Sequence, residues 1–193
     1  MHGKVVVTEY ITLDGVMENP EWIGPYFDND FLKFKYDELF ASDALLMGRF
    51  TYEYFLPVWL NATAADDAPG QEGFAERVHS LPKYVVSRTI NKSEWNNTRF
   101  INSNLVEAVT QLKRAPGQDI LVAGSGTLIQ TLMQNDLVDE YRLLVYPIIL
   151  GKGKRLFQEG RLTNLKLINL KGFSSGVVSQ VYQTDRNGSG QIS

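Results

Sequence analysis

Residues 119–157 restrict the possible folds of this chain more than any other segment. They begin with an apolar run at 120–123, of the kind that forms a strand buried on both faces. The glycine turn Gly124-Ser125-Gly126 follows, then apolar residues at helical spacing and a second apolar, β-branched run at 137–150. Strand, turn, helix and strand in this order predict a right-handed crossover unit that joins neighbouring parallel strands.

The rest of the chain continues this alternation. Apolar runs predict strands at residues 4–12, 44–47, 83–87 and 98–102, and helical spacing predicts helices at 30–40, 50–55, 74–79 and 105–113. Two alternating runs, 165–173 and 177–184, flank Ser174-Ser175-Gly176 and predict a β-hairpin. We therefore expect an α/β fold with three α/β/α layers, built on a mixed, mostly parallel sheet that ends in an antiparallel hairpin.

Length and composition limit the domain organisation and the chemistry. The 193 residues suit one domain, which we place at 1–185, and the Gly/Ser-rich residues 186–193 predict a disordered tail. Without cysteine, the chain has no disulfide, thiol nucleophile or thiolate metal ligand. With two histidines, His2 and His79, we expect no metal site and no Ser-His-Asp triad.

Charge and hydropathy limit the kinds of binding partner expected for this chain. A net charge of −3 without a long basic run argues against a nucleic-acid partner. The sequence has neither an apolar stretch of transmembrane length nor a signal-peptide pattern at its start. We therefore expect a cytoplasmic protein that acts on a small molecule and has no membrane partner.

The glycine turn at 124–126 has the chemistry of an anion site. A helix that starts at Gly126 or Thr127 leaves its first N–H groups unpaired, and its dipole makes that end partly positive. Glycines leave room for a phosphate to approach these N–H groups. The alternative is that Gly124 and Gly126 only allow a tight turn, and the turn alone does not distinguish the two.

Two other strand ends carry similar residues, GRFT at 48–51 and SRT at 87–89. Ligands of open α/β sheets bind at the carboxyl ends of the strands, and arginine is suited to forked phosphate contacts. Three such corners predict a ligand with several phosphates, such as a dinucleotide. Each corner also has a simpler explanation, with Arg49 as a surface ion-pair partner and Ser87 as a turn residue. Neither a G-x-G-x-x-G fingerprint nor a P-loop is present.

The order of these motifs resembles the dihydrofolate-reductase-like superfamily. The segments that carry the resemblance are TLDG, LLMGRFTYE, KYVVSRT, DILVAGSGTL and LVDEYRLLVYPIILGKGKRLF, within residues 4–184. The most similar branch is the C-terminal reductase domain of the bifunctional riboflavin-biosynthesis deaminase-reductase, with its stand-alone relatives. The resemblance implies a dihydrofolate-reductase-like fold, NADPH as cofactor, and a homodimer formed through the C-terminal strands.

The resemblance also assigns cofactor contacts at the three corners. It implies that Gly48, Arg49 and Thr51 contact the NADPH phosphates, that Ser87 and Arg88 bind the 2'-phosphate, and that Gly124, Ser125, Gly126, Thr127 and Leu128 hold the pyrophosphate. These are the same corners that the residues indicate as anion sites. A 2'-phosphate held by Arg88 predicts a preference for NADPH over NADH.

On the substrate side, the resemblance identifies residues 13–22 as a loop that closes over nicotinamide and substrate. Within it, Asp14 either contacts the substrate or holds the turn. Asp30 resembles the acidic residue that anchors the ring in dihydrofolate reductase, or else it caps its helix. These two carboxylates are the catalytic candidates. Candidate walls for the substrate ring, or alternatively core residues, are Trp22, Phe34 and Tyr52.

The sequence departs from the riboflavin enzyme in ways that leave the substrate open. The deaminase half is missing, Ala123 stands where that enzyme has glutamate, and no arginine motif follows Thr51. We predict an NADPH-dependent reductase that transfers hydride to a small heterocyclic or sugar-derived substrate, similar to 5-amino-6-(5-phosphoribosylamino)uracil reductase. The alternatives are a dihydrofolate reductase and a nucleotide-binding protein without reductase activity.

Overall fold

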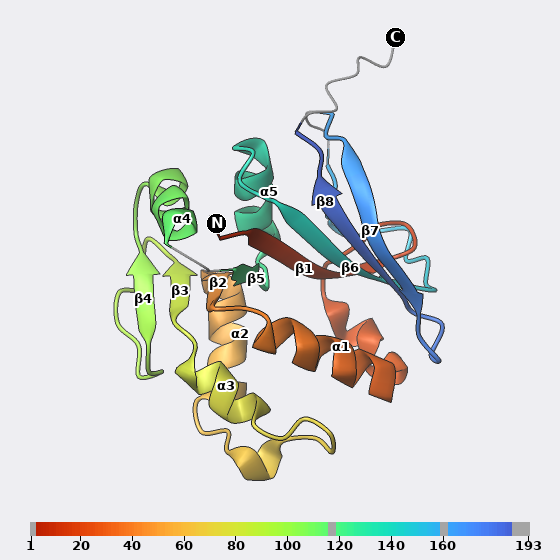
Figure 1. The fold of residues 1–193 in the computed structure, drawn as a ribbon, viewed down its shortest axis with the longest axis horizontal. Helices are drawn as coiled ribbons and strands as arrows, with labels where there is room; N and C mark the ends of the chain where they lie inside the picture. The colour runs from red at the N-terminus through yellow and green to blue at the C-terminus, as the bar shows by residue number, and fades with distance from the viewer. Residues whose placement is uncertain (1–2, 116–118, 159–161, 187–193) are drawn as a thin grey trace.

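The apolar runs of the sequence form an eight-stranded sheet in a computed structural model that describes residues 3–115, 119–158 and 162–186 (Figure 1). The strands are β1 (Val5–Thr12), β2 (Ala44–Gly48), β3 (Lys83–Val86), β4 (Thr98–Ile101), β5 (Ile120–Val122), β6 (Glu140–Tyr146), β7 (Leu165–Gly172) and β8 (Val178–Thr184). Their order is β4-β3-β2-β5-β1-β6-β8-β7. The first six are parallel, and β8 is antiparallel to both β6 and β7. The predicted mixed sheet with a C-terminal hairpin is confirmed.

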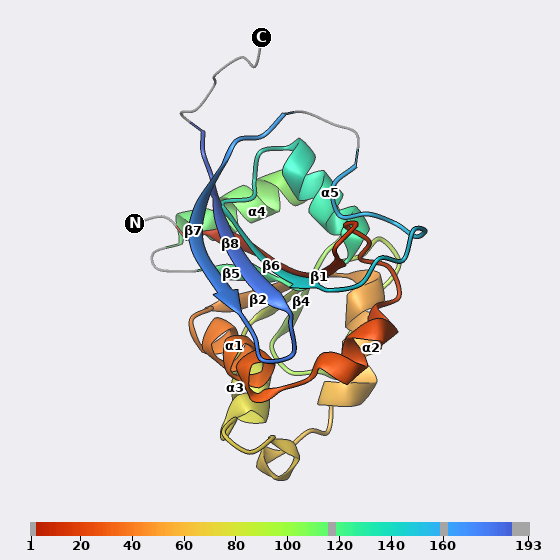
Figure 2. The ribbon, with the colours of Figure 1, turned by 90° about the vertical axis from the view of Figure 1, so that its right-hand side faces the viewer.

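Helices cover both faces of the sheet (Figure 2). On one face lie α1 (Asn29–Phe40), α2 (Arg49–Trp59) and α3 (Phe74–Ser80), and on the other α4 (Leu105–Arg114) and α5 (Gly126–Gln134). Two short 3-10 helices, η1 (Pro20–Tyr26) and η2 (Ala64–Asp66), lie in the connections. The three predicted layers are therefore confirmed. Among the described residues, no helix combines the length and the apolar character needed to span a bilayer.

The central strands are apolar without alternation because both of their faces are buried. All five residues of β2 are buried. Leu46 belongs to the core beneath α4 and α5, whereas Leu45 and Met47 belong to the core beneath α1, α2 and α3. The two cores fix the strand register, and the register in turn fixes which residues reach the carboxyl edge of the sheet.

Two expectations for residues 119–157 were wrong. The crossover β5–α5–β6 does not join neighbours, because β1 lies between the two strands: Val7 pairs with Val122 on one side and with Tyr141 on the other. The apolar run 137–150 is also not one strand. β6 ends at Tyr146, directly before Pro147, which has no N–H to donate to a ladder.

The chain after β6 turns back over the loop that follows β1. Leu13 N–H donates to Ile148 O at 2.8 Å, and Met17 N–H donates to Lys154 O at 2.9 Å. Of the predicted tail, residues 187–193 lie outside the described part of the chain. Arg186, the first residue of that predicted tail, forms an ion pair with Asp139 at 2.8 Å.

Candidate functional site

The three anion-suited turns meet along one edge of the sheet. They follow β3, β2 and β5, which are consecutive parallel strands, so their carboxyl ends lie at the same edge. Gly48 pairs with Val86 at the ends of β2 and β3. Gly48 N–H also donates to Gly124 O at 3.0 Å, which joins the turn after β2 to the turn after β5.

The glycines of this edge allow a close approach of the two turns. A Cβ on Gly48 would collide with Ser125 Oγ, and a Cβ on Gly124 would lie 2.8 Å from Thr51 Oγ1. Gly124 also has a φ of +98°, which L side chains rarely adopt, and the Gly124–Ser125 peptide bond is cis. Tight packing thus explains both glycines, and it also places the beginnings of α2 and α5 next to each other.

The N-termini of α2 and α5 are open to an anion. Their N-cap residues are Gly48 and Ser125, neither helix has a side-chain cap, and neither has an acidic residue in its first turn. In contrast, α1 is capped by Asp28, whose carboxylate accepts from Phe31 N–H at 2.7 Å. Two adjacent uncapped helix ends offer their first N–H groups and two partly positive dipole ends. This arrangement fits a pyrophosphate.

The arginines of the two other turns reach solvent. Arg49 pairs with Glu53 at 3.7 Å in an exposed pair that contributes little to stability. Arg88 is exposed and forms no ion pair with any residue that the structure describes. Ser87 is buried, and its hydroxyl accepts from Thr89 N–H at 3.2 Å and from Ile90 N–H at 2.9 Å. Ser87 thus holds the turn that presents Arg88.

Asp14 holds the loop after β1. Its carboxylate accepts from the Thr12 hydroxyl at 2.6 Å and from the N–H groups of Leu150 and Gly151 at 3.2 and 2.9 Å. The hydrogen bond from Thr12, together with those from the backbone, lowers the pKa of Asp14 to about 2. Of the two roles predicted for Asp14, this geometry favours the turn.

Asp30 connects α1 to the β7–β8 hairpin. Its carboxylate accepts from Lys171 Nζ at 2.7 Å and from Ser174 N–H at 3.1 Å, and these bonds hold its pKa below the usual value. The expectation that Asp30 caps α1 was wrong, because Asp28 is the N-cap. A substrate contact by Asp30 stays a prediction.

The three candidate ring walls lie in different places. Trp22 in η1 packs edge-on against Tyr146 with ring centroids 5.1 Å apart, and Phe34 in α1 packs against Phe173 at 6.1 Å. Tyr52 is only 3% exposed, and its hydroxyl donates to Ser93 Oγ at 2.7 Å. Tyr52 is therefore a core residue beneath β3 and β4, whereas Trp22 and Phe34 remain partly exposed.

The loop after β1 lies against the glycine turn. A Cβ on Gly126 would lie 3.2 Å from Met17 Sδ. The loop is anchored by the bridge between Val16 and Arg155 and by Lys154, whose Nζ lies 3.5 Å from Glu18 Oε1. The segment predicted to close over the site is therefore already beside it.

One acidic residue of this edge was missed by the sequence interpretation. Glu9 on β1 is half-buried, and its carboxylate accepts no hydrogen bond and forms no ion pair within the described part of the chain. Burial raises the pKa of Glu9 to about 8; Lys35 opposes this shift and Glu38 adds to it. The sequence did contain a signal for Glu9: a glutamate inside the run VVVTEYIT, which predicts a strand buried on both faces, is unusual because buried charged side chains are rare.

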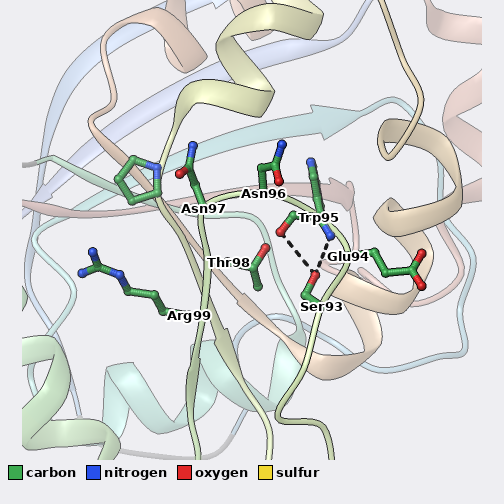
Figure 3. Close-up of a pocket in the computed structure, with 8 residues that line it drawn as sticks. Ser93, Glu94, Trp95, Asn96, Asn97, Thr98 and Arg99 are labelled. Carbon is green, nitrogen blue, oxygen red and sulfur yellow. Dashed lines mark hydrogen bonds between the residues drawn. The ribbon is translucent and has the colours of Figure 1, made fainter.

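A separate hollow of about 320 Å³ lies at the opposite edge of the sheet, where β3 and β4 begin. Pro82 and residues 93–99 line it (Figure 3). Ligands of parallel sheets bind at the carboxyl ends of the strands, so we place the site at the other edge. Within the described residues, no group of three or more His, Asp or Glu side chains is placed to hold a metal ion.

Comparison with known proteins shows similarity to one family. The model of the RibD C-terminal domain matches residues 3–179. Protein YyaP of Bacillus subtilis (strain 168), described as uncharacterized, is 37% identical over 185 residues, which cover 93% of this chain and 94% of YyaP. YwjB of the same organism, also described as uncharacterized, is 28% identical over 182 residues, 89% of this chain and 91% of YwjB.

Solved structures share the fold. A putative riboflavin biosynthesis protein from Shewanella sp. PV-4 has a TM-score of 0.71 at 22% identity, with 96% of this chain and 100% of that chain covered. A pyrimidine reductase-like protein from Corynebacterium diphtheriae has a TM-score of 0.62 at 14% identity, with coverage of 96% and 93%. The diaminohydroxyphosphoribosylaminopyrimidine deaminase/5-amino-6-(5-phosphoribosylamino)uracil reductase from Thermotoga maritima has a TM-score of 0.65 at 16% identity. That alignment covers 95% of this chain and 57% of the Thermotoga chain.

Proposed function

The chain belongs to the RibD C-terminal domain family, and we propose that it is an NADPH-dependent reductase. It transfers hydride to a C=N or C=O bond of a small heterocyclic or sugar-derived substrate. The observation that carries the proposal is the pair of uncapped helix N-termini joined by the hydrogen bond from Gly48 N–H to Gly124 O. Two adjacent anion sites and exposed arginines along one rim suit a ligand with several phosphates, such as a dinucleotide.

The residues of this edge fit the cofactor. The first N–H groups of α5, at Gly126, Thr127 and Leu128, hold the pyrophosphate, and α2 with Arg49 adds a second set of donors. Arg88, which has no carboxylate partner within the described part of the chain, binds the 2'-phosphate. The nicotinamide supplies the hydride when bound, and the chain orients the reactants and excludes water.

The substrate lies beside the aromatic residues of η1, β1 and β6. Trp22, Tyr26 and Tyr10 surround Tyr146, with ring centroids 5.1, 5.5 and 6.2 Å from its ring. The Tyr146 hydroxyl is buried and has no hydrogen-bond partner among the described residues. Tyr146 ends β6 at the carboxyl edge, so this unpaired hydroxyl is suited to bind a polar atom of the substrate once the Trp22 and Tyr26 rings that enclose it move aside.

The substrate class that we propose follows from the family. The Thermotoga protein is described as a 5-amino-6-(5-phosphoribosylamino)uracil reductase, so a ribosylamino-pyrimidine is the first compound to test. Dihydrofolate is the second. Its pterin ring would need a free carboxylate on α1, whereas Asp30 is paired with Lys171 at 2.7 Å. We therefore favour the pyrimidine.

A thermal-shift comparison of NADPH with NADH tests the cofactor assignment. We expect stabilisation by NADPH that exceeds stabilisation by NADH, and we expect Arg88→Ala to remove the difference. Arg99→Ala is the matched control, because Arg99 is an exposed arginine at the opposite edge of the sheet. Equal shifts for both nucleotides in the wild type would contradict the role of Arg88. If the protein bound NADPH but oxidised it with neither the pyrimidine nor dihydrofolate, it would be a nucleotide-binding protein without reductase activity.

We also propose a homodimer through the edge strand β7. Leu167, Ile168 and Leu170 are 49%, 50% and 60% exposed on this strand, which ends the sheet. An exposed edge with apolar side chains is a template for pairing with another chain. Light scattering is expected to give a dimer for the wild type and a monomer for Leu170→Lys, and a wild-type monomer would contradict the proposal.

A further inference from the structure

The carboxyl group of Glu9 lies at the turn between β5 and α5. β1 and β5 pair from Val5 with Ile120 to Val7 with Val122, so continuing this register places Glu9 opposite Gly124. A Cβ on Gly124 would lie 3.5 Å from Glu9 Oε1 and 2.8 Å from Thr51 Oγ1. Glu9 thus lies beside the glycine turn assigned to the pyrophosphate. Its neighbour on β1, Tyr10, packs against Tyr146 of the proposed substrate pocket, with ring centroids 6.2 Å apart, so Glu9 lies between the two sites.

The charged groups around Glu9 are engaged elsewhere. Lys35 on α1 forms an ion pair with Glu38 and donates to Thr8 Oγ1 at 3.3 Å. Arg142 on β6 donates to Glu140 at 2.8 Å and lies 4.0 Å from Glu38. Tyr10, the next residue on β1, lies beneath the Lys35 ammonium at 5.4 Å. No described cation forms an ion pair with Glu9, so no contact compensates for the burial of a charged form.

From this position we propose that Glu9 is a catalytic residue of the reductase, the acid that protonates the substrate during hydride transfer. The inference rests on the proposed function. The substrate carbon gains the hydride with its electron pair, and the π electrons of the C=N or C=O bond take the proton of Glu9. A C–H bond and an N–H or O–H bond form on the substrate, while the C–H bond of the reduced nicotinamide that supplies the hydride and the O–H bond of Glu9 break. Glu9 remains as a carboxylate and regains its proton from water.

The other carboxyl groups near the site are unsuited to this role. Asp14 and Asp30 each accept several hydrogen bonds, which hold their pKa values below the usual range, so both are ionised near neutral pH. A general acid works best when its pKa lies near the working pH. Burial raises the pKa of Glu9 to about 8, which keeps its proton available there.

The proposal has a consequence that does not require the substrate. Oxidation leaves a positive charge on the nicotinamide ring, and a nearby positive charge favours the carboxylate form of Glu9. Binding of NADP+ should therefore release a proton from Glu9, whereas binding of NADPH should not. Below about pH 8 the affinity for NADP+ then rises with pH, by up to about tenfold per pH unit, while the affinity for NADPH stays flat.

The experiment measures both dissociation constants between about pH 6 and pH 8 by isothermal titration calorimetry, in the wild type, Glu9→Gln and Glu94→Gln. We expect the pH dependence of NADP+ affinity in the wild type and in the exposed control Glu94→Gln, and its loss in Glu9→Gln. Glutamine has the shape of the protonated acid, and Glu9→Met is a second variant if the amide disturbs the fold. A slope that persists in Glu9→Gln, or is absent from the wild type while NADPH binds, overturns the proposal.

Single-turnover oxidation of NADPH with 5-amino-6-(5-phosphoribosylamino)uracil provides the kinetic readout. Glu9→Gln is expected to bind NADPH as the wild type does and to transfer hydride roughly 10²–10⁴-fold more slowly, as for loss of a general acid. An unchanged rate would overturn the role of Glu9. Failure of the wild type to bind either nucleotide would overturn the proposed function, and this inference with it.

Discussion

The substitution Glu9→Gln has a consequence for stability that follows from one raised pKa. The folded chain holds the proton of Glu9 with a pKa of about 8, against the ordinary value of 4.5 for a glutamate side chain in water. Because the folded state binds this proton more tightly than the unfolded state, raising the pH from about 4.5 towards 8 favours unfolding. Glutamine does not titrate, so the Glu9→Gln variant does not lose folding stability in this way as the pH rises. The gap in stability between variant and wild type therefore grows as the pH rises.

The size of this gap is limited by the linkage relation. One proton contributes at most about 1.4 kcal/mol per pH unit, or about 2.7 kcal/mol over two units. Because the Glu9 side chain is half-buried rather than fully enclosed, solvent screening reduces the expected gap to about 1–2 kcal/mol between about pH 5.5 and pH 7.5. At about pH 4 the two proteins should be nearly equal in stability, since Glu9 is then protonated in both states.

Urea unfolding followed by circular dichroism measures this gap at each pH. Glu94→Gln serves as the control, because Glu94 is an exposed glutamate at the opposite edge of the sheet, and its curve should run parallel to that of the wild type. Effects of other titrating groups cancel in the difference between variant and wild type. Parallel curves for Glu9→Gln and the wild type across the whole range would refute the environment that we assign to Glu9.

Three further substitutions test other parts of the structure. Lys83→Met should cost about 3 kcal/mol in urea unfolding, because Lys83 Nζ is fully buried and donates to the carbonyl oxygens of Val78, His79 and Leu81. Tyr146→Phe should leave stability unchanged or higher, since it removes an unpaired buried hydroxyl, but should raise the KM for the pyrimidine substrate. Asp14→Asn should increase amide hydrogen exchange in residues 13–18 and 148–156, as measured by mass spectrometry, because it weakens the bonds to Leu150 and Gly151.

The outcomes that contradict these expectations differ in kind. An unfolding free energy for Lys83→Met equal to that of the wild type would mean that the end of α3 finds other donors for its carbonyl groups. A KM unchanged in Tyr146→Phe would place the substrate away from the end of β6. Unchanged exchange in Asp14→Asn would show that the bridge between Val16 and Arg155 suffices to hold the loop.

The architecture was predictable because buried parallel strands have a strong sequence signature. The runs at β2 and β5 are apolar over their length, β1 begins with three consecutive valines, and each strand is followed by turn residues. The order of the strands in the sheet was harder to predict from the sequence. Nothing in the local pattern of β5 and β6 indicates that β1 pairs with both, because that choice depends on contacts between strands more than 100 positions apart in sequence.

The candidate site was predictable where it depends on backbone and not where it depends on side-chain partners. The glycines at 48 and 124 mark turns that only a chain without Cβ atoms can make so closely, and their spacing after strands is visible in the sequence. The partners of Asp30 were not visible. Lys171 and Ser174 lie more than 140 positions away and reach Asp30 only because the hairpin folds over α1.

The three carboxyl groups near the carboxyl edge of β1 show how environment separates chemically similar residues. Asp14 and Asp30 are surrounded by donors, which stabilise the charged form, so these residues hold the loop and the hairpin in place. Glu9 lies on β1 in a setting that stabilises the neutral form. Widely separated pKa values among neighbouring acids are a mark of divided roles in active sites. If Asp14 and Asp30 retained the protons and Glu9 titrated near its ordinary value in ¹³C NMR, the assignment of structural and catalytic roles would be reversed.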